Sequence, residues 1–190
     1  MEFDAVVLTG GSARRLGGAD KASLRIGGRS LLDRAVDALS GAGRVIVVGP
    51  RRPTLRPVAW ARESPVGAGP LAATAAGVEH VVADVLVVLA VDYPFVDAGV
   101  VAELLEGMGS HDGAALTDAE GNLHYVAGAY RVASVRAGIT RSGSEENASM
   151  RRVFSNLDVA EVHNDEAALD IDNPEDLEAA RRIATSETSD

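Results

Sequence analysis

The residues with the clearest chemical potential lie in a glycine-rich segment near the start of this 190-residue chain. Two adjacent glycines, Gly10 and Gly11, lie one residue after a run of apolar residues, and the segment ends at Lys21. Glycine lets the backbone turn sharply and approach a ligand, because it has no Cβ. Backbone N–H groups in such a turn bind phosphate, and Arg14, Arg15 and Lys21 add positive charge. The combination predicts a phosphate or nucleotide site rather than a simple strand-ending turn.

The spacing of these residues differs from that of the two commonest phosphate-binding loops. The P-loop pattern G-x-x-x-x-G-K-[ST] is not met, because Ala22 follows Lys21. The pattern G-x-G-x-x-G is not met either, because Gly10 and Gly11 are adjacent. A dinucleotide-binding Rossmann enzyme is therefore disfavoured.

A carboxylate that follows a buried strand is a candidate for binding a metal. Asp92 follows the β-branched run 85–91. Mg²⁺ takes one or two protein carboxylates together with phosphate oxygens, which suits this position. The alternative is that Asp92 caps the turn before Pro94. Asp170 and Asp172 precede the last helical pattern, where they would project to one side of an extended chain or cap the helix.

A further candidate segment joins an acidic residue to a helix start. Glu63 lies shortly before Gly69, Pro70 and Leu71, and a Gly-Pro pair entering a helix points its first N–H groups outward. Such a helix start is suited to an anion, whereas an ordinary exposed loop residue is the alternative for Glu63.

These separated segments together resemble the motifs of the molybdenum cofactor guanylyltransferase family. The N-terminal segment is similar to the signature L-x-G-G-x-x-x-R-x-G-x-D-K, with one extra residue between Gly17 and Asp20. Residues 63–73 resemble an acidic residue followed by G-P-L-A-G, residues 92–95 resemble D-x-P-F/Y, and residues 170–177 resemble D-x-D-T-P-E-D-L. The residues that match the N-terminal signature are Leu8, Gly10, Gly11, Arg15, Asp20 and Lys21.

The resemblance implies a Rossmann-like, three-layer α/β/α nucleotidyltransferase fold of the GT-A-like type, with a mostly parallel central sheet. It implies transfer of GMP from GTP to molybdopterin with Mg²⁺ as cofactor, giving molybdopterin guanine dinucleotide and pyrophosphate. GTP is favoured because this chain has Gly10-Gly11 and Gly69-Pro70-Leu71, whereas cytidylyl-type relatives have L-A-A-G and usually lack G-P-L. The implied catalytic residues are Lys21, Arg15 and Asp92, and the implied metal ligands are Asp92 and Asp172, with Asp170 as the weaker candidate. The resemblance also implies that Glu63 or the backbone carbonyls near Leu71 bind guanine, whose N–H donors a carboxylate or carbonyl accepts. The implied nucleotide-binding residues are Leu8, Thr9, Gly10, Gly11, Lys21, Glu63, Gly69, Pro70, Leu71 and Asp92.

Two departures from the family leave the acceptor side open. Residues 49–51 stand where many guanylyltransferases have Asn, and residues 124–130 stand where relatives commonly have Pro-Leu. A sugar phosphate or another small phosphorylated acceptor is one alternative, and a non-catalytic nucleotide-binding protein is another. The four histidines show no metal-ligand spacing and are assigned no role. Arginines that could bind the acceptor, with solvated helix charges as the alternative, are Arg141, Arg151 and Arg152.

The composition limits the expected partners. A formal net charge of −10 and few aromatic residues argue against nucleic-acid or anionic-membrane binding. The absence of cysteine excludes disulfides and thiol catalysis, and it is typical of a cytoplasmic protein. We expect no signal peptide, one domain over residues 1–184, a disordered tail over 185–190, and a monomer or weak homo-oligomer. Molybdoenzymes or cofactor chaperones are protein partners compatible with the resemblance.

Alternating strand and helix patterns must position these residues. Strands that are apolar throughout predict a parallel sheet covered on both faces, with ligands beyond its carboxyl ends. The residues expected to converge on one cleft follow Leu8, Val48, Ala61 and Val91. Strands are predicted over residues 3–8, 44–49, 58–61, 85–91 (central), 112–117, 125–130 and 159–162. Helices are predicted over 30–39, 70–82, 97–108, 149–154 and 173–184, with Ser30 and Asp97 as N-caps.

Overall fold

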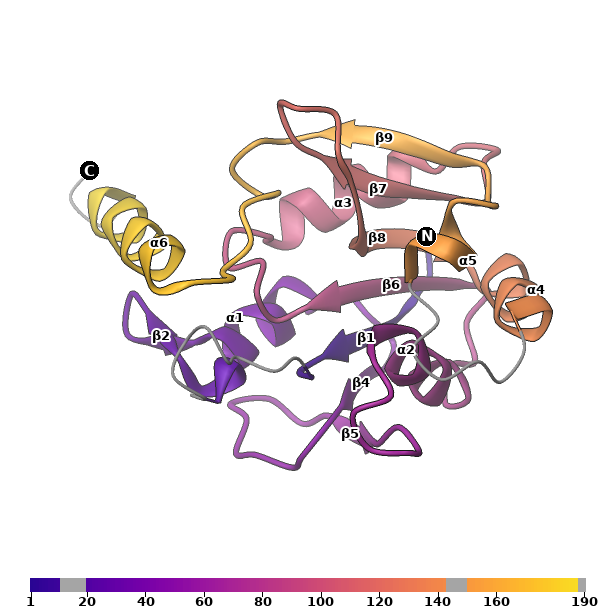
Figure 1. Cartoon of the computed structure of the whole chain (residues 1–190), viewed down its shortest axis with the longest axis horizontal. Helices are drawn as coiled ribbons and strands as arrows, with labels where there is room; N and C mark the ends of the chain where they lie inside the picture. The colour runs from indigo at the N-terminus through magenta and orange to yellow at the C-terminus, as the bar shows by residue number, and fades with distance from the viewer. Residues whose placement is uncertain (11–19, 143–149, 188–190) are drawn as a thin grey trace.

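Seven strands form the main sheet of the protein (Figure 1). The computed structural model describes residues 1–10, 20–142 and 150–187, so expectations about Gly11, Arg14, Arg15 and the Arg152 side chain lie outside it. The strands are β1 (Asp4–Leu8), β4 (Val45–Val48), β5 (Ala59–Ala61), β6 (Val85–Ala90), β7 (Gly113–Thr117), β8 (Leu123–Arg131) and β9 (Val159–His163). Their order is β5-β4-β1-β6-β8-β7-β9, which confirms the central position of β6.

Helices cover both faces of this sheet, which confirms the three-layer α/β/α architecture (Figure 1). One face carries α1 (Leu31–Ala38), α3 (Ala98–Gly107) and α6 (Pro174–Glu187), and the other carries α2 (Pro70–Val78), α4 (Val132–Ser142) and α5 (Met150–Phe154). In β1, Val7 packs in the first of these layers, whereas Val6 and Leu8 pack in the second. Burial on both faces explains why the strand is apolar throughout. None of the helices within the described ranges has the length and apolar composition of a membrane span.

The sheet is mostly parallel, and β8 is the exception. β1 runs parallel to β4 and β6, β4 to β5, and β7 to β9, whereas β8 is antiparallel to β6 and β7. The expectation of a mostly parallel sheet is therefore confirmed, although the apolar strand patterns alone did not indicate the antiparallel β8. Only residues 118–122 separate β7 from β8, and so short a connection joins antiparallel neighbours, because a parallel crossover needs a dozen residues or more.

The predicted elements are found, with local differences at their ends. The N-caps are confirmed, since Ser30 accepts from Asp33 N at 3.0 Å and Asp97 accepts from Val100 N at 2.9 Å. Helix α2 ends at Val78 rather than at residue 82, and α6 continues to Glu187, so residues 185–187 of the expected tail are helical. Elements missing from the prediction are α4, the 3₁₀ turn η2 (Lys21–Ser23) and the hairpin β2 (Arg25–Ile26)–β3 (Arg29–Ser30).

Close packing of α2 on β1 depends on Gly77. A Cβ at this position would lie 2.5 Å from Cγ1 and 2.7 Å from Cγ2 of Val6. Glycine avoids this overlap, so the helix can lie directly on the strand. Because α2 connects the carboxyl end of β5 to the amino end of β6, its N-terminus lies at the carboxyl edge of the sheet (Figure 1).

Candidate functional site

The carboxyl ends of neighbouring strands meet at one edge of the sheet. Val91 N donates to Leu8 O at 3.1 Å, and Thr9 N donates to Val48 O at 3.2 Å. These bonds continue the parallel pairing one residue beyond the strands and bring the following residues side by side, as predicted. The Thr9 hydroxyl also donates to Val48 O at 2.9 Å, so this side chain supports the strand ends.

Gly49 continues the same edge after β4. Its N–H donates to Ala61 O at 3.0 Å, and its φ is +143°. A Cβ at this position would overlap the Thr9 hydroxyl oxygen. The close approach of Thr9 therefore requires glycine at position 49. Residues 49–51 stand where many guanylyltransferases have Asn, and Gly49 has no side chain.

Lys21 contacts both carboxylates that the resemblance implies as metal ligands. Its Nζ atom donates to Asp92 Oδ2 at 2.9 Å and to Asp172 Oδ1 at 3.1 Å. Burial opposes the charged form of Lys21, but the Asp92 charge and the hydrogen bonds to Asp92 and Asp172 outweigh it and raise the pKa of Lys21. The cluster joins η2, the loop after β6 and the segment before α6, which come from distant parts of the chain.

The two carboxylates are available for more than capping. Asn173 caps α6, since its Oδ1 accepts from Glu175 N at 2.9 Å and from Asp176 N at 3.0 Å. This capping role therefore does not need the carboxylate of Asp172. In Asp92, Oδ1 is buried and has no hydrogen-bond partner within the described residues.

The donor set at this position fits Mg²⁺. A buried carboxylate oxygen without a partner is costly unless a ligand satisfies it, and Mg²⁺ needs only one or two carboxylates besides phosphate and water. Among the described residues, no three His, Asp or Glu side chains are grouped so that they could hold a metal ion by themselves. Phosphate and water would have to complete the coordination. Burial, followed by the charges of Asp172 and Asp92, raises the pKa of Asp170, which agrees with its lower rank as a ligand.

The turn before α2 has its own contacts, which are separate from those of the Lys21 cluster. Glu63 Oε1 accepts from Gly67 N at 3.1 Å, and no hydrogen bond or ion pair joins it to Lys21 within the described residues. Gly69 is the N-cap of α2 and has a φ of +92°, Pro70 is at the start of the helix, and Leu71 is buried in the core. The backbone at this helix start, rather than the Leu71 side chain, is what a ligand would meet.

A comparison with protein-family models identifies the family of the chain. A family model described as the MobA-like NTP transferase domain matches residues 5–162. The chain belongs to this family. The matched range contains Lys21, Glu63 and Asp92, whereas Asp172 follows it.

Named members of this MobA-like group are similar to the chain over part of their length. A molybdenum cofactor guanylyltransferase from Cereibacter sphaeroides is 34% identical over 147 residues, which are 70% of this chain and 71% of the relative. Another, from a Shewanella species, is 30% identical over 117 residues, and the match spans 59% of each chain. The chain thus matches about three fifths of the length of the Shewanella relative.

Solved structures support the fold over nearly the whole MobA-like chain. Molybdopterin-guanine dinucleotide biosynthesis protein A from Archaeoglobus fulgidus gives a TM-score of 0.77 at 20% identity, covering 96% of this chain and 99% of that one. The 2-C-methyl-D-erythritol 4-phosphate cytidylyltransferase from Thermus thermophilus gives 0.74 at 24% identity, covering 97% and 100%. The nucleotidyltransferase fold is therefore confirmed.

A hydrogen-bonded chain beside Asp92 is missing from the sequence prediction. His124 Nδ1 lies 3.0 Å from the Tyr93 hydroxyl, and His124 Nε2 lies 3.3 Å from Asp118 Oδ2. With Nε2–H donating to the carboxylate, Nδ1 accepts from the hydroxyl, an assignment based on the Asp118 partner. Burial, followed by the charges of Asp92 and Asp170, raises the pKa of Tyr93 and keeps it protonated. The departure from Pro-Leu at residues 124–130 was the only sequence signal for this contact.

The second missed contact joins Arg52 to Asp20, the residue before Lys21. Arg52 Nε lies 2.5 Å from Asp20 Oδ2, and Arg52 Nη2 lies 2.6 Å from Asp20 Oδ1. The contact ties the loop after β4 to the end of the glycine-rich segment. No local pattern marks it, because the two residues are far apart in sequence.

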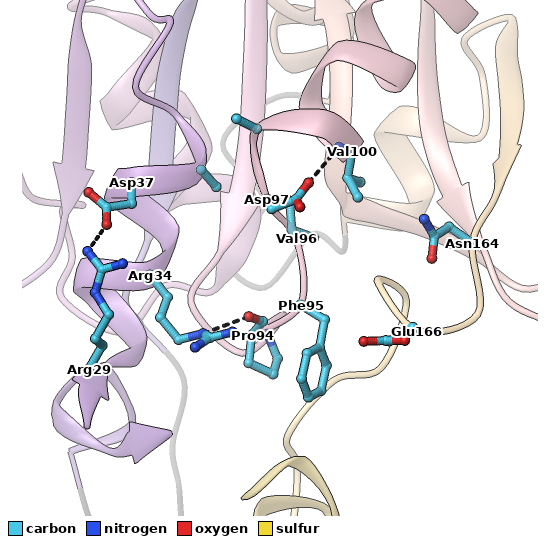
Figure 2. A pocket seen from close by; sticks show the side chains of 12 residues that line it. Arg29, Arg34, Asp37, Pro94, Phe95, Val96, Asp97, Val100, Asn164 and Glu166 are labelled. Atoms are coloured by element: carbon cyan, nitrogen blue, oxygen red, sulfur yellow. Dashed lines mark hydrogen bonds and ion pairs between the residues drawn. The ribbon is translucent and has the colours of Figure 1, made fainter. Parts of the chain in front are cut away.

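A cavity of about 430 Å³ lies on the α1 and α3 side of the loop that carries Asp92 (Figure 2). Arg34 Nε donates to Pro94 O at 2.8 Å and thereby fixes this loop to α1. The lining contains none of Lys21, Asp92 and Asp172, so the cavity is separate from the cluster. Its lining includes Arg34, Phe95, Val96, Val100, Asn164 and Glu166.

Of the arginines considered for the acceptor, Arg141 and Arg151 make no contact with the Lys21 cluster within the described residues. The pKa of Asp112 is lowered. The hydrogen bond from the Ser134 hydroxyl is the largest cause, and the charge of Arg141 is the smallest. Asp112 precedes β7 and lies at the amino edge of the sheet, so Arg141 is near the edge opposite Asp92. Arg151 is exposed on α5.

Proposed function

We propose that the protein transfers GMP from GTP to molybdopterin, releasing pyrophosphate and forming molybdopterin guanine dinucleotide. The observation that carries the proposal is the pairing of Lys21 with Asp92 and Asp172 at the carboxyl edge, at 2.9 and 3.1 Å. A cation and two carboxylates at this edge suit a nucleoside triphosphate with its metal. The names of the curated relatives supply the acceptor in the proposal.

Lys21 would bind the phosphate oxygens of GTP. Its raised pKa keeps Nζ protonated at neutral pH, and its two carboxylate contacts fix its position before substrate arrives. A preorganised charge stabilises a transition state without the cost of reorienting during the reaction. The backbone N–H groups of Gly10 and Gly11, together with Arg15, would add further donors.

Asp92 and Asp172 would hold Mg²⁺, with the unpartnered Oδ1 of Asp92 as one ligand. When bound, the ion would neutralise charge on the phosphate oxygens. Lys21 would then exchange carboxylate contacts for phosphate contacts. Both Asp92 and Lys21 therefore take part in substrate binding as well as in stabilising the transition state.

The transfer itself depends on positioning. An oxygen of the acceptor phosphate attacks the α-phosphorus of GTP, and the bond from that phosphorus to the departing pyrophosphate breaks. The attacking phosphate is already anionic, so no side chain has to remove a proton from it. Guanine would lie near the turn before α2, where Glu63 has a second carboxylate oxygen to accept its N–H groups.

Pyrophosphate release tests this proposal. Purified protein with Mg²⁺ and molybdopterin should release pyrophosphate with GTP and much more slowly with CTP, UTP or ATP. Preference for CTP would contradict the choice of base. Release with a sugar phosphate but not with molybdopterin would contradict the acceptor, and GTP binding without any transfer would favour a non-catalytic nucleotide-binding protein.

A further inference from the structure

Arg52 makes a contact next to the nucleotide site that the proposed reaction does not use. It extends from the loop after β4, and its side chain is only 17% exposed. Its Nε and Nη2 atoms bind both oxygens of Asp20, at 2.5 and 2.6 Å, and its Nη1 donates to Pro50 O at 2.8 Å. All three guanidinium nitrogens therefore have partners, and the guanidinium plane has a defined orientation.

This geometry differs from that of an ordinary surface ion pair. Most exposed pairs of single charges contribute little, because water screens them and the side chains are mobile. A two-point Arg–carboxylate contact fixes both groups in one plane. The pKa of Asp20 is lowered, with the hydrogen bond from Arg52 as the largest cause.

The contact reaches Lys21 through the backbone. Asp20 precedes Lys21 and starts the turn η2, where its carbonyl accepts from Ser23 N at 3.0 Å and its Oδ2 accepts from Ser23 Oγ at 2.7 Å. Fixing the Asp20 side chain therefore fixes the start of the turn that presents Lys21. The positive charge of Arg52 also balances the negative charge of the Asp20 carboxylate, so Asp20 repels the phosphates less.

We infer that Arg52 is a positioning residue for nucleotide binding: by clamping Asp20, it holds Lys21 where it meets the triphosphate. The inference rests on the proposed nucleotide site and adds a residue that does not itself touch the substrate. It links the loop after β4 to the phosphate site through one side chain.

Nucleotide affinity provides the test, with the neighbouring arginine as matched control. Calorimetry would give the dissociation constant of Mg-GTP for the wild type, Arg52→Ala, Arg52→Lys and Arg51→Ala, with thermal unfolding measured for each. Arg52→Ala should weaken binding by about ten- to a hundredfold, the usual range for losing a hydrogen-bonded charged partner. Arg51 is exposed, and Arg51→Ala should bind as the wild type does.

The partner variant separates positioning from general stability. If Arg52 acts through Asp20, the double variant Arg52→Ala/Asp20→Ala should lose no more affinity than the weaker-binding single variant. Additive losses, or Arg52→Ala binding like Arg51→Ala, would overturn the inference. A purely structural role would lower the melting temperature and leave the affinity of the folded protein unchanged.

Two further outcomes distinguish a failure of the Arg52 inference from a failure of the proposed function. If Arg52→Ala does not fold, Arg52→Lys decides, because lysine keeps the charge but loses the two-point contact, and wild-type affinity would overturn the inference. If the wild type binds GTP but transfers nothing to molybdopterin, the acceptor proposal fails and the affinity comparison still holds. A wild type that binds no nucleoside triphosphate overturns both.

Discussion

The Nζ atom of Lys21 lies between carboxylates from two distant segments, at 2.9 Å from Asp92 and 3.1 Å from Asp172. The charge of each of these three side chains affects the other two. Removing the lysine leaves two carboxylates facing each other without a cation, and removing Asp92 takes away the buried oxygen that lacks a partner. The charge balance of the site therefore depends on these individual side chains.

Neutral substitutions test that balance directly. Lys21→Met keeps most of the side-chain volume, and Asp92→Asn keeps the shape of the carboxylate. Each should lower turnover by about 10²- to 10³-fold, the cost of removing one preorganised charge contact. Pyrophosphate release under saturating GTP measures the effect, and circular dichroism checks that both variants fold. Turnover near the wild-type value in either variant would remove that side chain from the proposed mechanism.

At the scale of elements, the β7–β8 hairpin is joined to the loop after β6. Asp118, directly after β7, accepts from Asn122 N at 2.8 Å and from Asn122 Nδ2 at 2.9 Å, and it also contacts His124. His124 continues the connection to Tyr93, next to Asp92. The hairpin is thus connected through His124 and Tyr93 to the loop that carries Asp92.

The pH dependence of stability should report on this hairpin. Hydrogen bonds from Asn122, first from its side chain and then from its backbone, lower the pKa of Asp118 from 3.8 to about 2. Because the folded-state pKa is depressed, ionised Asp118 contributes stability above pH 3.8, and the contribution is lost as the pH falls toward 2. Asp118→Asn should therefore melt below the wild type near neutral pH, and thermal scans should show the gap closing in acid. A gap independent of pH would show that the charge is not responsible.

The contact between α2 and β1 predicts a second effect at this scale. Gly77→Ala places a Cβ 2.5 Å from Val6 Cγ1, and overpacking of this kind costs about 1–3 kcal/mol. Urea unfolding should show that loss. Adding Val6→Ala makes room for the new methyl group, so the double variant should be more stable than the sum of the two single effects. Strict additivity would mean that the helix moves away from the strand instead.

Across the whole molecule, the sequence predicts what local patterns determine. The buried strands follow from apolar runs, the caps at Ser30 and Asp97 from their side chains, and the Lys21–Asp92–Asp172 cluster from motif resemblance and the strand-end rule. Other features depend on distant partners. The pairing of Arg52 with Asp20 and of His124 with Tyr93 arises only when segments far apart in the sequence meet, so no spacing reveals it. Helix α4 begins directly after β8 without a turn signal, which explains its absence from the predicted elements.

Because the cluster joins three distant segments, ligand binding should stabilise the whole fold. A ligand that binds only the folded state adds about 2.7 kcal/mol at a hundred times its dissociation constant. Mg-GTP should therefore raise the melting temperature of the wild type in differential scanning fluorimetry, and GTP with EDTA should raise it less. Asp92→Asn should lose most of the Mg²⁺-dependent part, because the variant lacks the charged carboxylate that is proposed to hold Mg²⁺. An equal Mg²⁺-dependent rise in Asp92→Asn and the wild type would place the metal elsewhere.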